Sequence, residues 1–167
     1  MGTEIERKFL VKNDGWRASA TARSDLRQGY LATENGNTVR IRTDGVQAWL
    51  TIKGPAKGAS RAEFEYEVPT SDALALLELC ADRVVEKARS RVPVGGHVWE
   101  VDEFSGCNAG LVVAEVELRE ENERVSLPDW LGREVTGDRR FENANLSTRP
   151  FRAWTEAERA NLGAGAA

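Results

Sequence analysis

Apolar and polar residues alternate along the first two-thirds of the chain. Short runs rich in Val, Ile, Thr and aromatic residues recur between turn residues, a pattern that predicts successive antiparallel strands. Turn signals such as Asn35-Gly36, Asp44-Gly45 and Gly95-Gly96 separate these runs. We expect about eight strands, near residues 4–12, 26–33, 38–43, 48–54, 61–69, 84–93, 97–104 and 111–118.

The rest of the pattern predicts a few helices. A capping signal followed by apolar residues at helical spacing predicts a helix near 71–79, packed on the sheet. Alternation stops after the eighth strand, and further helical stretches are expected near 141–146 and 152–161. Since no repeat or linker divides the sequence, we expect one domain over residues 1–161 and a flexible tail at 162–167.

Each predicted strand carries charged residues on one face, since alternate side chains of a strand point the same way. The charges form unbroken rows of one sign, as in Glu63-x-Glu65-x-Glu67 and Arg40-x-Arg42. A sheet with one solvated face explains any single row of this kind. Rows on five strands favour a second interpretation, in which the charged faces bind ligands, because adjacent like charges are unfavourable unless something neutralises them.

Two kinds of ligand would neutralise these rows. Divalent cations suit the carboxylates, and an oligo-anion suits the Arg and Lys rows. A closed barrel of eight strands has an interior just wide enough for side chains and one small ligand. Burying these charged rows costs too much free energy unless bound ligands and ion pairs between the rows compensate for it. The predicted fold class is therefore mainly β (α+β), a closed eight-stranded antiparallel β-barrel tunnel with a charged interior and a few helices packed outside.

The overall charge balance excludes some function classes. A net charge of -4 and a pI near 5.2 argue against a nucleic-acid or anionic-membrane binder, which needs an excess of Lys and Arg. Cys80, Cys107 and His97 match neither a disulfide framework nor the spacing of zinc ligands. The start of the chain is charged where a signal peptide would need an apolar run, and we expect a cytoplasmic protein.

An ordered set of motifs runs along almost the whole chain. It comprises Glu4-Ile5-Glu6-Arg7-Lys8, Gln28-Gly29-Tyr30-Leu31, Val39-Arg40-Ile41-Arg42, Leu50-Thr51-Ile52-Lys53-Gly54, Arg61-Ala62-Glu63-Phe64-Glu65, Lys87-Ala88-Arg89, Trp99-Glu100-Val101-Asp102 and Ala114-Glu115-Val116-Glu117-Leu118. Together these motifs resemble the triphosphate tunnel metalloenzyme superfamily, also called the CYTH domain, and especially its compact bacterial members. The resemblance implies an eight-stranded tunnel that holds a linear triphosphate.

The resemblance also implies a role for each matching charged residue. The implied metal ligands, for one or two Mg²⁺ or Mn²⁺ ions, are Glu4, Glu6, Glu63, Glu65, Asp102, Glu115 and Glu117. The implied substrate-binding cations are Lys8, Arg40, Arg42, Lys53, Lys87, Arg89 and Arg140, with Arg139 as the alternative to Arg140 at one mouth. The expected catalytic residues are Glu4, Glu6, Lys8 and Lys87.

The function predicted on this basis is metal-dependent hydrolysis of a small-molecule triphosphate. The dense charge lining, without an obvious aromatic cradle, favours inorganic tripolyphosphate, cleaved to pyrophosphate and phosphate. A nucleoside or thiamine triphosphatase, or an adenylate cyclase, remains an alternative within the superfamily. From another class, a non-catalytic polyphosphate-binding module and a scaffold with a merely solvated charged face also remain open. We expect no nucleic-acid or membrane partner, and either a monomer or a homodimer.

Overall fold

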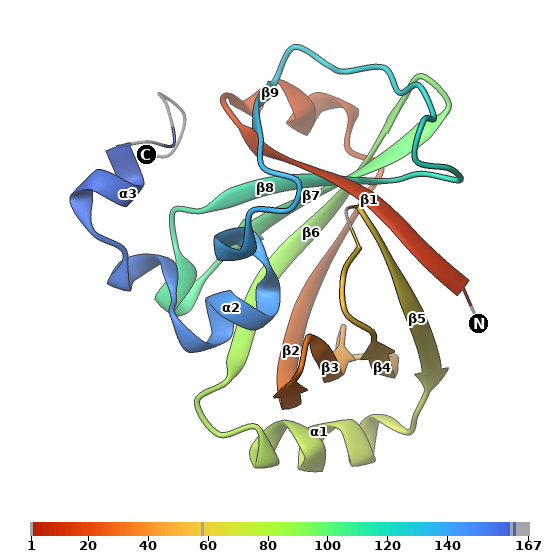
Figure 1. The fold of residues 1–167 in the computed structure, drawn as a ribbon, viewed down its shortest axis with the longest axis vertical. Helices are drawn as coiled ribbons and strands as arrows, with labels where there is room; N and C mark the ends of the chain where they lie inside the picture. The colour runs from red at the N-terminus through yellow and green to blue at the C-terminus, as the bar shows by residue number, and fades with distance from the viewer. Residues whose placement is uncertain (1, 58, 161, 163–167) are drawn as a thin grey trace.

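The strands close into a barrel, as predicted. A computed structural model describes residues 2–57, 59–160 and 162. Within these residues one antiparallel sheet has the strand order β5-β4-β3-β2-β6-β7-β8-β1-β9, and β5 also pairs with β1. That pairing closes the first eight strands of the order, while β9 extends the sheet beyond β1 (Figure 1). The prediction of a mainly β, closed eight-stranded antiparallel barrel is confirmed, with one extra strand.

The strands and helices lie close to the predicted segments, although the stretch expected to be helical at 152–161 is divided into a 3-10 turn and a short helix, and residue 161 lies outside the described residues. The strands are β1 (Gly2–Val11), β2 (Ala22–Glu34), β3 (Asn37–Thr43), β4 (Ala48–Lys53), β5 (Ser60–Glu67), β6 (Val84–Val94), β7 (His97–Phe104), β8 (Val112–Glu117) and β9 (Leu131–Glu134). The helices are α1 (Thr70–Leu79), α2 (Asn143–Thr148) and α3 (Glu156–Ala160), with 3-10 turns η1 (Asp14–Ser19), η2 (Gly106–Asn108), η3 (Arg139–Phe141) and η4 (Phe151–Ala153). The sequence pattern did not predict β9 or η1, and β2 begins earlier than expected.

Tight turns fix how the strands pair. Between β2 and β3, Asn35 and Gly36 both have positive φ, at 53° and 80°. This is the backbone of a two-residue hairpin whose twist matches that of the flanking strands. Gly95 and Gly96 do the same between β6 and β7, with φ of 59° and 87°. The resulting registers keep each charged row on one side of the sheet.

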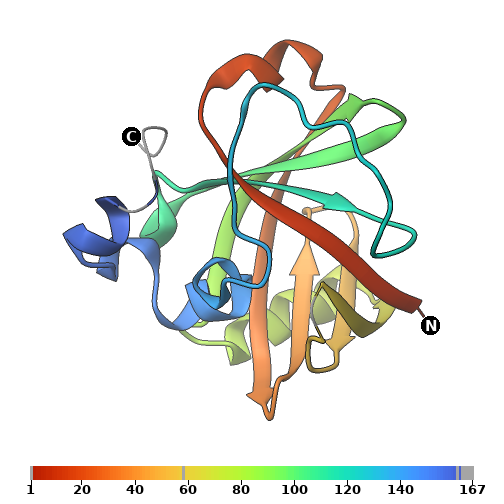
Figure 2. The ribbon, with the colours of Figure 1, turned by 45° about the horizontal axis from the view of Figure 1, so that its top comes forward.

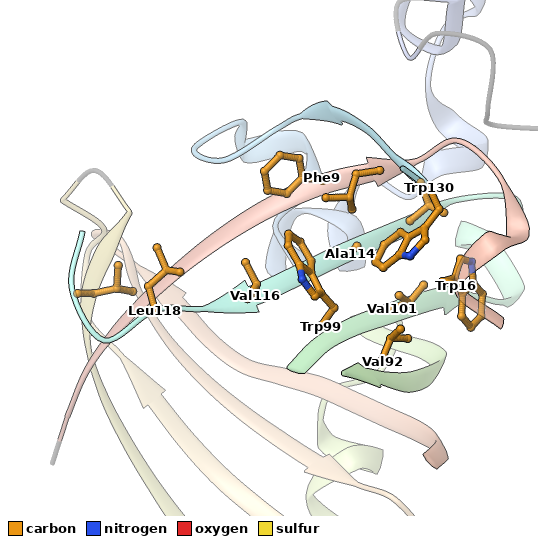
Figure 3. Packing of buried hydrophobic residues seen from close by; sticks show 12 residues of the cluster. Phe9, Trp16, Val92, Trp99, Val101, Ala114, Val116, Leu118 and Trp130 are labelled. Atoms are coloured by element: carbon orange, nitrogen blue, oxygen red, sulfur yellow. The ribbon is translucent and has the colours of Figure 1, made fainter. Parts of the chain in front are cut away.

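Most of the apolar outer face is covered. Trp99, on β7, packs edge-on against Phe9 and Trp130, with ring centroids 5.6 and 5.8 Å apart. Figure 3 shows these rings together with Trp16, which reaches the same cluster from η1. Edge-to-face aromatic pairs add to the stabilisation from area burial. This cluster anchors the β1–β8–β7–β6 wall of the barrel.

Helices cover two further parts of the outer face. The helix α1 packs on the outside of the wall formed by β2, β3 and β4, and it crosses behind these strands in Figure 2 (see also Figure 1). The helix α2 packs against β2 and β6, the turn η4 packs against η2, and these segments bury Leu146 and Phe151. Of the predicted tail at 162–167, the structure describes Leu162, which is buried in that cluster, and the remainder lies outside the described residues.

Part of the outer face remains uncovered. Ile52 on β4 and Tyr66 on β5 are exposed, at 39% and 55%. In the described ranges, no helix is long and apolar enough to cross a membrane.

Candidate functional site

The charged rows of the strands meet in one cavity inside the barrel, of about 940 Å³. The residues of the sequence prediction that line it are Glu4, Glu6, Lys8, Arg40, Arg42, Lys53, Glu63, Glu65, Arg89, Glu115 and Glu117. Further charged residues that line it, for which no role was expected, include Arg61, Arg91, Glu100, Arg119 and Glu142. The acidic and basic rows therefore converge on a shared cavity inside the barrel.

Three predicted site residues lie elsewhere. Lys87 and Asp102 form a pair in the barrel wall, with side chains 1% and 0% exposed, and neither is among the residues that line the cavity. Arg140 pairs with Asp138 at 2.6 Å and lies outside the cavity, whereas the neighbouring Arg139 lines it. The two arginines diverge because both belong to a 3-10 turn, in which successive side chains point about 120° apart.

A closed ion-pair network occupies the β6–β7–β8 wall. Arg89 donates two hydrogen bonds to Asp102, Nε to Oδ1 and Nη2 to Oδ2, each 2.7 Å long. Lys87 Nζ lies 2.5 Å from Asp102 Oδ2, and Arg89 Nη2 lies 3.1 Å from Glu115 Oε2. The network reaches β1 through Lys8 Nζ, 2.9 Å from Glu115 Oε1. Cross-strand register makes this possible, since Arg89 faces Asp102 and Lys8 faces Glu115 directly.

The network shifts the pKa values of its members. Burial opposes ionisation of Glu115, but Lys8 and Arg89 outweigh it and hold the pKa of this carboxyl well below its usual range. Burial also opposes ionisation of Asp102, whose pKa Arg89 and Lys87 nevertheless lower. Burial lowers the pKa of Lys87 to about 8, against the attraction of Asp102. Paired charges thus keep both carboxylates ionised inside the wall.

A second, looser network lies on the β1–β4–β5 side. Lys53 Nζ lies 2.8 and 2.7 Å from the two carboxylate oxygens of Glu4, and Arg61 Nε donates to Glu4 Oε2 at 2.8 Å. Arg61 also reaches Glu6 at 3.5 Å, and Lys53 reaches Glu63 at 3.3 Å. Like charges are close together here. Burial and the nearby Glu115 and Glu4 raise the pKa of Glu6, although Lys8 opposes them.

The β3 arginines retain unused donors. Arg40 Nη2 donates to Thr51 Oγ1 at 3.0 Å, and both Arg40 and Arg42 lie near Glu65, at 3.6 and 3.3 Å. The Nε–H groups of Arg40 and Arg42 are buried and have no acceptor within the described part of the chain. An unpaired buried donor is costly, so these groups fit the oxygens of an anionic ligand.

The carboxylates fit a divalent cation by donor type but are not arranged as an open metal site. No three acidic, His or Cys side chains converge as metal ligands in residues 2–57, 59–160 and 162. Lys53, Arg61 and Lys8 instead engage the carboxylates. Glu117 differs, because burial and the nearby Glu4 raise its pKa and no ion pair neutralises it in the described residues. Such oxygen ligands suit Mg²⁺ or Mn²⁺ once their cationic partners are engaged elsewhere.

Arg61 and Tyr30 are two of the cavity residues to which sequence reasoning gave no role. Arg61 shares the inward face of β5 with Glu63, two positions on, so period-two alternation could have placed it there. Tyr30 shares the inward face of β2 with Gln28, whose Nε2 donates to the Tyr30 hydroxyl at 2.9 Å. Tyr30 is part of one of the sequence motifs but received no role, because it belongs to no charged row.

The fold and the cavity place this protein among antiparallel β-barrel proteins whose tunnel is lined by alternating carboxylates and cations. The family model of the CYTH domain matches residues 2–149. The chain therefore belongs to the CYTH domain family, as the sequence motifs predicted.

Relatives and solved structures agree with this assignment. An inorganic triphosphatase of Acetivibrio thermocellus is 46% identical over 93% of this chain and 100% of the relative. One of Nitrosomonas europaea is 36% identical over 87% of this chain and 97% of the relative. A crystal structure of an inorganic triphosphatase, 34% identical, covers 88% of this chain and 95% of that chain with a TM-score of 0.64. A Pyrococcus horikoshii protein shares the fold at 19% identity, covering 71% of this chain and 80% of that chain with a TM-score of 0.58.

Proposed function

We propose that the protein is a divalent-metal-dependent triphosphatase that cleaves inorganic tripolyphosphate to pyrophosphate and phosphate. The observation that carries this proposal is the convergence of cationic and acidic rows on one enclosed cavity. The names of the two relatives, both inorganic triphosphatases at 46% and 36% identity, support it. A linear triphosphate and its metal ions together supply the two kinds of partner that the rows need.

The cations of the cavity would bind and align the substrate. Arg40 and Arg42 offer planar guanidinium groups with free Nε–H donors, while Lys8 and Lys53 act as point charges. Arg89 adds a guanidinium held in place by Asp102. Phosphoryl transfer depends mainly on such alignment and charge neutralisation, so the protein itself needs no nucleophile.

The carboxylates would hold the metal ions. When bound, Mg²⁺ or Mn²⁺ neutralises phosphate charge and makes a water molecule a better nucleophile. The ligands we propose from the cavity lining are Glu4, Glu6, Glu63, Glu65, Glu115 and Glu117. Asp102 and Lys87 lie behind the lining, and we propose that they orient Arg89 instead of contacting metal or substrate. In the same way Arg139 takes the place of Arg140 at the mouth of the tunnel.

The lining favours a substrate without a base. Among the lining residues in the described ranges, the aromatic rings are those of Tyr30 and His97, and Tyr30 is 4% exposed. Bases are usually held by stacking on exposed aromatic faces. The cavity therefore offers abundant charge for phosphates and little surface for adenine or thiamine.

A substrate panel tests the proposal. Phosphate release is measured from tripolyphosphate, ATP and thiamine triphosphate, each with Mg²⁺, Mn²⁺ or EDTA. We expect tripolyphosphate to be the preferred substrate and EDTA to abolish turnover. A clear preference for ATP would overturn the choice of substrate. Tight binding of tripolyphosphate without turnover under either metal would instead favour a non-catalytic binding module.

Substitution of Arg40 tests whether the cavity is the site. The change Arg40→Ala removes a guanidinium that lines the tunnel, and kcat/KM for tripolyphosphate should fall by about 10²- to 10³-fold. Arg27→Ala is the matched control, since Arg27 forms an exposed pair with Glu86 on the outside of the barrel. Equal activity in both variants would mean that the charged face is only a scaffold.

A further inference from the structure

Arg61 bridges two of the proposed metal ligands. Its Nε donates to Glu4 Oε2 at 2.8 Å, and its Nη2 lies 3.5 Å from Glu6 Oε1. Lys53 occupies both oxygens of the same Glu4 carboxylate. The carboxylate oxygens that would bind a divalent ion are thus already engaged by two cations.

A metal ion and a guanidinium compete for the same carboxylate lone pairs. A divalent cation would therefore have to displace Arg61 from Glu4 and Glu6, and that displacement weakens the binding of the metal alone. A polyphosphate competes in the opposite sense, because its oxygens are acceptors that a guanidinium binds well. Arg61 lines the cavity into which such an anion would fit.

Arg61 is also placed to exchange partners. Its side chain is 23% exposed, whereas Lys53 is 9% exposed and Arg89 is 14% exposed and held by three carboxylates. Two single contacts hold Arg61, and neither is the paired, two-bond geometry that fixes Arg89 on Asp102. A long side chain held in this way changes partner at low cost.

We propose that Arg61 is an exchangeable counter-cation that couples the binding of metal and triphosphate. Before the anion enters, Arg61 neutralises Glu4 and Glu6. When the triphosphate enters, Arg61 moves to a phosphate oxygen and gives up its contacts with both carboxylates, so the metal has one competing cation fewer to displace. Each ligand then strengthens the binding of the other by the same factor, as linkage requires. This inference rests on the proposed function, because it takes Glu4 and Glu6 as metal ligands.

Two separate titrations test the exchange. The first follows Mn²⁺ binding to the protein alone, by loss of the electron paramagnetic resonance signal of free Mn²⁺. The second follows tripolyphosphate binding in EDTA by calorimetry, where no metal is present to support hydrolysis. The variant Arg61→Gln should bind Mn²⁺ about tenfold more tightly and tripolyphosphate about tenfold more weakly, since one positive charge has left the cavity. A merely structural role for Arg61 would not change the two affinities in opposite directions.

Two control variants test whether the effect depends on the positive charge at residue 61 and on its place in the cavity. Arg61→Lys keeps the charge and should remain within a few-fold of the wild type in both titrations. Arg23→Gln removes an arginine from an ion pair with Glu103 on the outer surface, and both affinities should stay unchanged. Circular dichroism checks that each variant is folded, and Arg61→Met replaces Arg61→Gln if the latter is not.

Two results would overturn the inference. One is unchanged or weaker Mn²⁺ binding by Arg61→Gln, and the other is tighter Mn²⁺ binding with unchanged tripolyphosphate affinity. Turnover by the wild type is measured in parallel with Mn²⁺ and tripolyphosphate. Absence of turnover would refute the proposed function, while the Mn²⁺ titrations would still decide whether Arg61 masks the carboxylates.

Discussion

The two sides of the tunnel hold their charges in different ways. On the β6–β8 side, Lys87, Arg89, Asp102 and Glu115 form a network with side-chain exposures of 0–14%, which we call the closed side. The open side, around β1, β4 and β5, has exposures of 9–23% and consists of Glu4, Glu6, Lys53, Arg61 and Glu63. A buried charge that loses its partner costs several kcal/mol, whereas a partly solvated pair is worth little. The closed side is therefore built to stay paired, whereas Glu6, Arg61 and Glu63 on the open side, each 23% exposed, exchange partners more readily.

The sharpest test of this difference is the loss of one carboxylate from each side. Asp102→Asn removes the charge that Lys87 and Arg89 share, and leaves two buried cations undercompensated. We expect the free energy of unfolding to fall by about 3–5 kcal/mol. Glu63→Gln removes a carboxylate that is 23% exposed and 3.3 Å from Lys53, and should cost less than about 1 kcal/mol.

Urea unfolding of the two variants and the wild type, followed by circular dichroism, measures both values. Equal losses of stability in the two variants would show that the closed side is no more dependent on its pairs than the open side. The comparison does not depend on activity, since Asp102 lies behind the cavity lining.

The alkaline stability of the protein tests the closed side in another way. Burial lowers the pKa of Lys87 from 10.5 to about 8. Between these two pH values the unfolded chain holds a proton on this lysine that the folded chain has released. The unfolded state thus binds more protons, and the free energy of unfolding rises with pH through this window. The contribution of Lys87 should be on the order of 2 kcal/mol.

Unfolding of the wild type and of Lys87→Met, measured at intervals from pH 7.5 to about pH 10, checks this contribution. The rise in the free energy of unfolding that Lys87 causes should be missing in Lys87→Met. It should be present in Lys12→Met, which changes an exposed lysine. Parallel pH profiles for all three proteins would contradict the lowered pKa of the buried Lys87.

The barrel and the inward face of each strand could be predicted from the sequence. Period-two alternation places Glu4, Glu6 and Lys8 on one face regardless of how the strands pair. Rows of like charge, such as Arg40 and Arg42, then predict that this face is enclosed. Both inferences use local rules, and the observed cavity agrees with them.

Depth within the barrel could not be predicted in the same way. Alternation gives the face on which Lys87 and Arg89 lie, but not that Lys87 is covered by the segment 139–148, where its Nζ meets Asn143 at 3.3 Å. That depends on the long-range packing of the C-terminal part of the chain. For the same reason β9 was missed, since its four residues become a strand only by pairing with β1. Cross-strand register also sets which charges pair with one another. Alternation alone does not show that Arg61 lies opposite Glu4, so Arg61 received no role from the sequence.

The smallest expected effect concerns Glu117, a carboxylate that lines the cavity next to the open side and has no ion pair in the described residues. Burial, with repulsion from Glu4, Glu63 and Glu100, raises its pKa, so its charge opposes folding at neutral pH. Glu117→Gln should therefore stabilise the protein at pH 7, by up to about 0.5 kcal/mol. Because a raised pKa penalises only the ionised form, this gain should shrink as the pH falls towards 4.5, the ordinary pKa of a glutamate, and disappear below it.

The same substitution should weaken Mn²⁺ binding, because Glu117 is among the proposed metal ligands and forms no ion pair within residues 2–57, 59–160 and 162. Urea unfolding at pH 7 and pH 4.5 and Mn²⁺ titration measure the two effects together, with Glu121→Gln as the control at an exposed loop position. A stability gain paired with weaker metal binding is the sign of a residue kept for its ligand and not for the fold. If Glu117→Gln instead destabilised the protein at pH 7, Glu117 would be part of a paired structural network, and the contrast between the two sides of the tunnel would no longer hold.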